Sequence, residues 1–142
     1  RLTMRVTLSA DAKRYIRLFA EETDINPLDC LIEGDRVVLL IPAGKMADAI
    51  GPDGHTVDRV EAKLGREIEL VENADTPAAF VASALAPAAV RGVTISEQGD
   101  RVAYAEVAEA DRGIAIGNDG RRIETARKLA QRHYDIDDIT LT

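Results

Sequence analysis

The spacing of hydrophobic and polar residues changes along the first half of the chain from helical to strand-like and back. Ser9, a residue type that caps helices, precedes apolar positions at helical spacing, and two stretches rich in β-branched residues flank a Gly-Asp turn. Two short amphipathic segments then surround a loop that contains glycine, and an alternating segment follows. This half therefore predicts a helix, a hairpin, two short helices and a strand, at residues 9–23, 28–33, 36–41, 45–50, 57–64 and 67–72.

The second half repeats this order of elements. Pro77, at a position typical of a first helical turn, starts a helix that Pro87 ends. A hairpin, two helices around a second loop and a final strand follow, at residues 92–96, 101–107, 111–116, 121–133 and 136–141. We therefore expect two domains, residues 1–73 and 74–142, joined by a short linker.

The two loops carry the same phrase, Ile-Gly-x-x-Gly-x-x-(Val/Ile). It begins at Ile50 and again at Ile116, 66 positions later. Glycine is needed where a turn leaves no room for a Cβ or where another backbone must come close, although it also ends ordinary helices. Two copies with matching apolar flanks favour a functional loop. We expect replacement of the paired glycines to block a ligand's backbone while leaving the fold in place.

The chain is acidic and poor in lysine. Of its 142 residues 25 are Asp or Glu, 14 are Arg and 4 are Lys, which gives a formal net charge of −7. That balance is unfavourable for binding a polyanion at low ionic strength. It suits a protein that stays hydrated in concentrated salt, where repulsion between charges is screened. The composition thus favours a halophilic source over an ordinary acidic cytosolic protein.

Residues that usually carry catalysis or hold metals are scarce. The chain has one cysteine, Cys30, which we expect in the core, and two histidines, so its sequence shows no metal-ligand spacing. The glycine loops lack the Gly-Lys-(Ser/Thr) ending of a nucleotide-binding P-loop, and no nucleophile has a triad context. We therefore expect no enzymatic activity, no cofactor and no metal. Without a signal segment or an apolar run of membrane-spanning length, the sequence predicts a cytoplasmic location without membrane association.

The order helix, strand, strand, helix, loop, helix, strand makes each half resemble a type II KH RNA-binding module. That resemblance implies an α+β fold in which a three-stranded sheet packs against three helices, twice in tandem. Such a pair resembles the KH modules of the NusA family of transcription factors, and residues 80–90, Phe-Val-Ala-Ser-Ala-Leu-Ala-Pro-Ala-Ala-Val, look like the segment that opens the second of them. The resemblance covers nearly the whole chain, and a KH pair without further domains is similar to the archaeal form.

The resemblance implies a role in transcription regulation, by termination or antitermination, through binding of single-stranded RNA in the nascent transcript. RNA polymerase is a further partner that the family implies, and we expect the protein to be a monomer. Two alternatives stay open. One is a KH protein of ribosome assembly or RNA turnover, and the other is a protein-interaction scaffold on a KH fold.

The resemblance also places the RNA-binding residues at the loops and on the helices beside them. In a KH fold the Gly-x-x-Gly loop clamps the backbone of about four nucleotides, and an apolar groove beside it receives the bases. Backbone N–H groups of the loop and the start of the following helix attract phosphate. The candidate residues are Lys45, Gly51, Pro52, Asp53 and Gly54 in the first half and Arg112, Gly117, Asn118, Asp119, Gly120, Arg121 and Arg122 in the second.

Both loops depart from the family, because KH loops usually carry a basic residue between the glycines. Here the pairs are Pro52-Asp53 and Asn118-Asp119, and an aspartate that faces phosphate weakens binding at low salt. Either the loops have lost their affinity for RNA, or the salt concentration at which the protein works screens the negative charge. We favour the screening. Residues 112–133 hold six basic and two acidic residues, whereas the charges cancel over 44–66, so we expect the second loop to supply more of the affinity.

Overall fold

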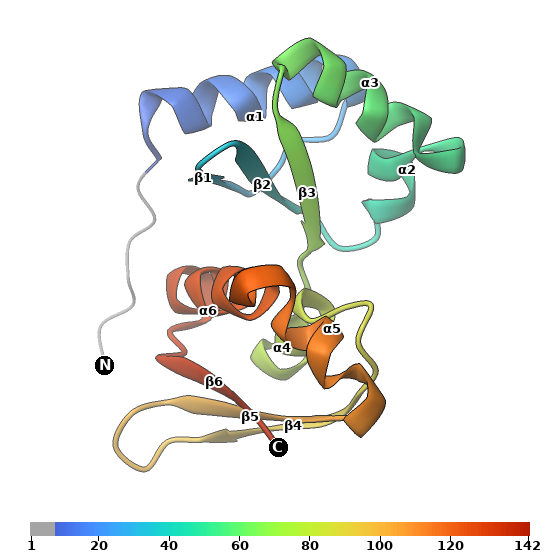
Figure 1. Cartoon of the computed structure of the whole chain (residues 1–142). Coiled ribbons are helices and arrows are strands. Elements are labelled where there is room, and N and C mark those ends of the chain that lie inside the picture. Colours follow the sequence, from blue (N-terminus) through green and yellow to red (C-terminus); the bar gives the residue numbers. More distant parts are fainter. Residues whose placement is uncertain (1–7) are drawn as a thin grey trace. The chain divides into compact units, whose positions relative to one another are not determined.

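The structure, a computed structural model, describes residues 8–142. Within that range the backbone forms two compact units, residues 8–73 and 74–142 (Figure 1). Each unit contains helices and one three-stranded sheet, so the α+β class expected from the sequence is confirmed. No helix in residues 8–142 is long and apolar enough to cross a membrane.

The first unit begins with a capped helix. Its elements are α1 (Ala10–Thr23), β1 (Asp29–Glu33), β2 (Arg36–Ile41), α2 (Met46–Ile50), α3 (His55–Leu64) and β3 (Glu67–Glu72). The Ser9 side chain accepts a hydrogen bond of 3.1 Å from the Ala12 N–H, which satisfies one of the free donors at the start of α1. Gly65 ends α3 in the left-handed conformation, with φ of 69°. Both helix ends agree with the sequence prediction.

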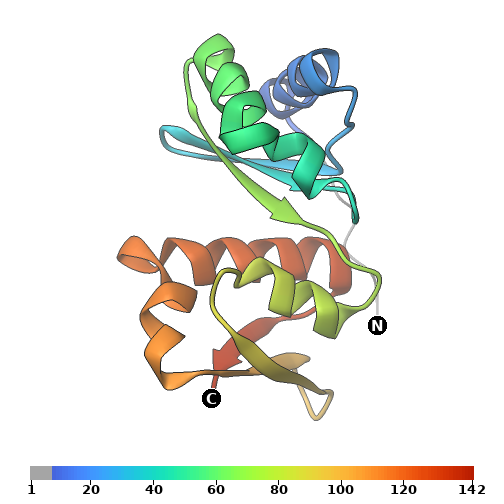
Figure 2. The same ribbon diagram turned by 90° about the vertical axis from the view of Figure 1, so that its right-hand side faces the viewer.

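The sheet of the first unit has the strand order β1-β2-β3. β1 and β2 form an antiparallel hairpin, and β2 pairs with β3 in parallel, with Leu39 opposite Leu70. Parallel neighbours need a crossover connection, and α2, the loop and α3 form it. Figure 2 shows α1, α2 and α3 on one face of this sheet. The core between them includes Tyr15, Phe19 and Val60, so both aromatic residues of α1 are core residues.

The second unit repeats this arrangement. Its elements are α4 (Pro77–Ala84), β4 (Val90–Ser96), β5 (Val102–Val107), α5 (Arg112–Ile116), α6 (Arg121–Tyr134) and β6 (Asp138–Leu141). The strand order is β4-β5-β6, with β4 and β5 antiparallel and β5 and β6 parallel. The rings of Phe80 on α4 and Tyr134 on α6 stack with their centroids 5.0 Å apart. The Tyr134 hydroxyl also donates to the Ala74 C=O, so this ring joins α4, α6 and the start of the unit.

The first residues of β4 and β6 differ from those that the sequence pattern predicts. β4 starts at Val90, two residues earlier, because Val90 still pairs with Val107 across an irregularity in the ladder. β6 starts at Asp138, two residues later. The N–H of Ile136 donates to the Ala130 C=O and so belongs to the end of α6.

Candidate nucleic-acid interface

The two Gly-x-x-Gly loops have the same backbone conformation although their middle residues differ. Each forms a single 3₁₀ turn, η1 (Pro52–Gly54) and η3 (Asn118–Gly120), closed by a hydrogen bond of 3.1 Å from the second glycine's N–H to the first glycine's C=O. The first glycine has φ/ψ of 77°/172° in one loop and 80°/173° in the other. The second glycine has φ of 76° and 73°. In both units these four residues therefore connect the helix before the loop to the helix after it.

The third residue of each loop is an aspartate in the left-handed region, with φ of 53° at Asp53 and 55° at Asp119. Among residues with a side chain, Asp and Asn tolerate this conformation best. Lysine or arginine at the same position would be strained by about 1 kcal/mol or more. The absence of a basic residue at this third position therefore has a backbone cause in addition to any effect on charge.

The glycines of a loop differ in what surrounds them. A Cβ on Gly117 would lie 2.8 Å from the Arg122 backbone nitrogen, and one on Gly51 would lie 2.1 Å from the Thr56 Oγ1. A Cβ on Gly120 would meet no atom within 4 Å. The expectation that both glycines can be replaced without disturbing the fold is therefore wrong for the first glycine, because it packs against the following helix.

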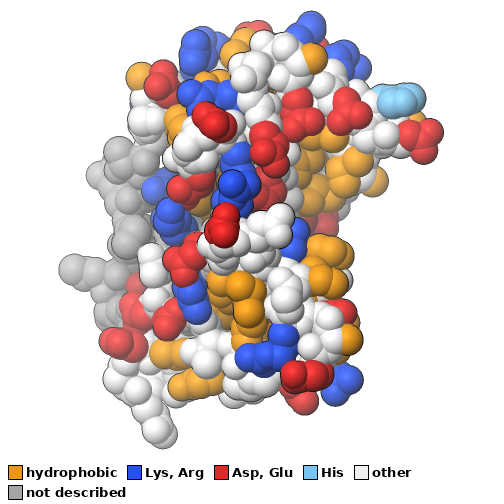
Figure 3. All heavy atoms as spheres, in the orientation of Figure 1, with side chains coloured by type: hydrophobic (Ala, Val, Ile, Leu, Met, Phe, Trp, Pro, Cys, Tyr) orange, Lys and Arg blue, Asp and Glu red, His pale blue; other side chains and the backbone are white. Residues whose placement is uncertain are grey.

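Exposed isoleucines stand directly before each loop. Ile50 and Ile116, the last residues of α2 and α5, are 39% and 40% exposed, and Ile114 is 39% exposed. Ala49 and Ala115, next to them on the same helices, are fully buried. Over α2 and its loop, hydrophobic side chains (orange) lie beside acidic ones (red) in Figure 3. A half-exposed isoleucine thus stands at the same position before each loop.

Most positive charge near the first loop is paired within the unit. Glu22 on α1 forms ion pairs with Lys63, at 2.6 Å, and with Arg59, at 3.5 Å, on α3. The hydrogen bond from Lys63 lowers the pKa of Glu22, and the charges of Lys63 and Arg59 add to this effect. Lys45 forms no ion pair within residues 8–142, but it precedes α2 and so lies at the end of that helix away from the loop.

The second loop has more unpaired positive charge beside it. Arg121 is the first residue of α6, directly after the loop, and forms no ion pair in the described part of the chain. Arg122 donates across the loop to the Ile114 C=O and so joins α6 to α5. Arg112 is also without an ion pair among the described residues, but it begins α5, about 7 Å of helix before the loop. Arg121 and Arg122 therefore carry the charge nearest to the loop.

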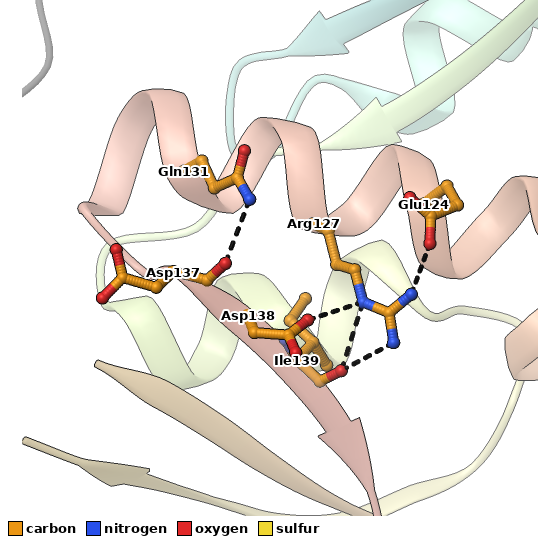
Figure 4. Close-up of polar contacts among 6 residues, drawn as sticks. All are labelled: Glu124, Arg127, Gln131, Asp137, Asp138 and Ile139. Atoms are coloured by element: carbon orange, nitrogen blue, oxygen red, sulfur yellow. Dashed lines mark hydrogen bonds and ion pairs between the residues drawn. The ribbon is translucent and has the colours of Figure 1, made fainter. Parts of the chain in front are cut away.

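Two further residues, which sequence reasoning did not single out, contact the edge strands. On α3, the Glu61 Oε2 accepts a hydrogen bond of 2.8 Å from the Ile68 N–H of β3. On α6, the Arg127 Nη2 donates to the Ile139 C=O of β6 at 3.0 Å (Figure 4). Both residues lie seven positions after the second glycine of their loop. That shared spacing is the sequence signal that could have found them.

The remaining candidate chemistry lies away from the loops. Cys30 is buried in the core of the first unit, as the sequence predicts. Within residues 8–142, no group of three or more His, Cys, Asp and Glu side chains could hold a metal ion. The loops and their flanking helices offer backbone N–H groups, guanidinium groups and apolar side chains.

Comparison with known proteins matches the chain to one family. Residues 77–142 match the family model described as the NusA-like second KH domain. A protein of Halococcus morrhuae is 59% identical over 138 residues, which cover 97% of this chain and 99% of that protein. A protein of Halobacterium salinarum is 55% identical over 139 residues, which cover 98% of this chain and 100% of that protein. Both are named probable transcription termination protein NusA, and both sources are halophilic archaea, as the composition predicts.

More distant similarities also extend over most of the chain. A protein of Methanocaldococcus jannaschii with the same name is 28% identical over 133 residues, which cover 93% of this chain and 73% of that protein. A solved structure titled "Crystal structure of APE1850" matches with a TM-score of 0.82 and 23% identity, and covers 95% of this chain and 100% of its own. At that identity the likeness concerns the fold.

Proposed function

Because the chain belongs to the NusA family of transcription termination proteins, we propose that it acts in transcription by binding single-stranded RNA of the nascent transcript. The family model covers the second unit, and the relatives from halophilic archaea match over nearly their whole length, so the membership extends to the whole chain. The proposed activity is binding, without a catalytic step.

We assign residues 1–73 and 74–142 to one type II KH module each. The order of elements supports this assignment, because in both units a helix precedes the hairpin and a single strand follows the loop helices. A type I module would place two strands after those helices. These two segments are the first and the second module.

The observation that carries the proposal is the shared loop conformation beside exposed isoleucines. A KH loop clamps the sugar-phosphate backbone of about four nucleotides, so a backbone that is the same in both copies is the feature that RNA binding would require. The proposed RNA-binding residues are Lys45, Gly51, Pro52, Asp53 and Gly54 in the first module and Arg112, Gly117, Asn118, Asp119, Gly120, Arg121 and Arg122 in the second.

We propose the second module as the stronger RNA binder. Its loop leads directly into Arg121 and Arg122 at the start of α6, where the helix dipole also favours a phosphate. The corresponding residues of the first module are His55 and Thr56. Because each loop also carries an aspartate, few contacts to phosphate are cationic. Backbone N–H groups and base contacts therefore supply most of the affinity, and these are weakened less by salt.

RNA polymerase is the second proposed partner, and the protein is proposed to act as a monomer. Copurification with RNA polymerase distinguishes a transcription factor from a KH protein of ribosome assembly or RNA turnover. A protein-interaction scaffold is favoured by one observation, the exposed aspartate of each loop, which repels phosphate at low salt.

Crosslinking of the full chain to RNA tests the proposal. The RNA is single-stranded, contains a photoreactive uridine, and is long enough for both loops, about eight nucleotides or more. In concentrated KCl, we expect crosslinks to map by mass spectrometry to residues 50–56 and 116–122, and the same RNA in a duplex to give far fewer. A folded chain without crosslinks at either loop, at low and at high KCl, would contradict RNA binding and favour the scaffold.

A further inference from the structure

The position seven residues after the second loop glycine is acidic in the first module and basic in the second. Glu61 on α3 and Arg127 on α6 occupy it. Each side chain contacts the backbone of the strand that follows its helix, and both strands, β3 and β6, are at an edge of their sheets. The two positions are therefore matched in structure and opposite in chemistry.

The Glu61 carboxylate has one oxygen in use and one available. Its Oε2 accepts the Ile68 N–H at 2.8 Å, which fixes the side chain on the edge of β3. Its Oε1 has no hydrogen-bond donor within residues 8–142. An ionised carboxylate accepts hydrogen bonds and donates none. The available atom therefore suits the amino group that adenine carries at C6 and cytosine at C4, and it repels the carbonyl oxygen that guanine and uracil carry at the same positions.

Arg127 is held on the edge of β6 and keeps N–H groups that make no contact within the unit. Its Nε and Nη2 donate to the Ile139 C=O at 3.3 and 3.0 Å, Nε pairs with the Asp138 Oδ1 at 2.8 Å, and Nη1 pairs with Glu124 (Figure 4). A guanidinium has five N–H groups and no acceptor, so a second N–H remains on each terminal nitrogen. The side chain is 30% exposed. Its available groups suit the carbonyl oxygen that guanine carries at C6 and uracil at C4.

We propose that this position sets the class of base that each module prefers, by contacting the group at C6 of a purine or C4 of a pyrimidine. Glu61 then favours the amino group of adenine and cytosine, and Arg127 favours the carbonyl oxygen of guanine and uracil. The proposal rests on the proposed RNA binding and adds to it the substrate class of each module. Carboxylates that accept from amino groups, and arginines that donate to carbonyl oxygens, are pairings by which proteins read base edges. Both side chains are already fixed by the strand backbone, so little conformational freedom is lost when a base binds.

Glutamine tests the proposal because it exchanges the polarity of the available atom and keeps the internal contact. In Glu61→Gln the amide oxygen can still accept from the Ile68 N–H, which leaves the amide NH₂ for the base. In Arg127→Gln the amide NH₂ can still donate to the Ile139 C=O, which leaves the oxygen for the base. Arg127→Lys keeps a donor and should keep the original preference. Glu21→Gln and Arg91→Gln, at exposed positions on α1 and β4, are the matched controls.

The measurement is selection from a randomised single-stranded RNA pool by the full chain and by each variant in concentrated KCl, followed by sequencing. The original chain should enrich one segment in adenine and cytosine and another in guanine and uracil, each by roughly five- to tenfold. Glu61→Gln should switch the first segment alone and Arg127→Gln the second alone, while Arg127→Lys and both controls change neither.

The outcomes separate this inference from the function on which it rests. If the original chain enriches RNA and both glutamine variants keep its base preference, the inference is wrong and RNA binding stands. If the glutamine variants lose affinity equally for all bases, the position has a structural role and the inference is again wrong. If the original chain, shown by circular dichroism to be folded, enriches no RNA, both the inference and the proposed function fail.

Discussion

Alanine at the two glycines of the second loop should have very different effects on stability. At Gly117, φ/ψ of 80°/173° lies in a region that is open essentially to glycine alone, and a side chain there costs about 1–3 kcal/mol. The new Cβ would also lie 2.8 Å from the Arg122 backbone nitrogen and 2.9 Å from its Cβ, and such overpacking costs about 1–3 kcal/mol more. The lower entropy of alanine in the unfolded chain offsets about 0.4–1 kcal/mol. We expect Gly117→Ala to lower the free energy of unfolding by about 2–4 kcal/mol.

At Gly120 the same change meets open space. Its φ of 73° and ψ of 13° are in the left-handed region, which costs alanine about 1–2 kcal/mol, and the offset from the unfolded chain is the same. A loss of about 0.5–1 kcal/mol in the free energy of unfolding is expected. The added methyl group faces solvent at the surface proposed to clamp RNA, so the affinity for RNA should fall although the fold is retained.

Hydrogen exchange and RNA binding by fluorescence anisotropy measure the two effects on the same samples. Exchange of the α5 and α6 amides should be strongly accelerated in Gly117→Ala and little changed in Gly120→Ala. Gly54→Ala in the first loop is the matched control for the RNA effect, and it should weaken binding less than Gly120→Ala. Equal exchange in both second-loop variants would refute the packing argument, and a larger loss of affinity from the first loop would refute the assignment of the stronger module.

Two further predictions concern charge. Asp119→Asn removes the loop's negative charge and keeps a residue that tolerates the left-handed conformation. RNA affinity, measured by anisotropy, should therefore rise at low KCl and change little in concentrated KCl. Equal gains in affinity at both KCl concentrations would mean that Asp119 does not face phosphate. Lys63 and Arg59 lower the pKa of Glu22 in the folded protein. The Glu22 carboxylate therefore stabilises the fold at pH values above its unfolded pKa, near 4.5, and this stabilisation is lost as the pH falls through the lower pKa of the folded protein. Urea unfolding between pH 7 and 3 at low salt should therefore show a smaller loss of stability in Glu22→Gln, and identical pH profiles would contradict the ion pairs.

Elements whose ends depend on neighbouring residues could be predicted from the sequence. Ser9 caps α1 and Gly65 ends α3 because capping acts within a few positions of the chain. The start of β6 could not be predicted, since Ile136 continues an apolar pattern but its N–H is used at the end of α6. Periodicity alone does not tell which partner a backbone N–H finds in the folded chain.

The candidate site was predictable in position and less so in chemistry. The repeated glycines located both loops, but the left-handed conformation of Asp53 and Asp119 is a property of the folded turn. Counting charges overestimates the free positive charge near the second loop. Arg127 pairs with Asp138 and Glu124, and Arg122 donates to a carbonyl, and these contacts depend on how α6 packs on its neighbours.

The salt dependence of RNA affinity is the most direct test of RNA binding by two acidic glycine loops, because it counts their cationic contacts with phosphate. For single-stranded RNA the logarithm of affinity falls with the logarithm of salt by about 0.7 for each phosphate neutralised. With about two or three such contacts, we expect a slope of roughly −1.5 to −2 and binding that persists in concentrated KCl. A slope steeper than about −3, with binding lost in concentrated KCl, would contradict it, because arginines on phosphates would then carry the affinity in place of the loop backbone and the bases.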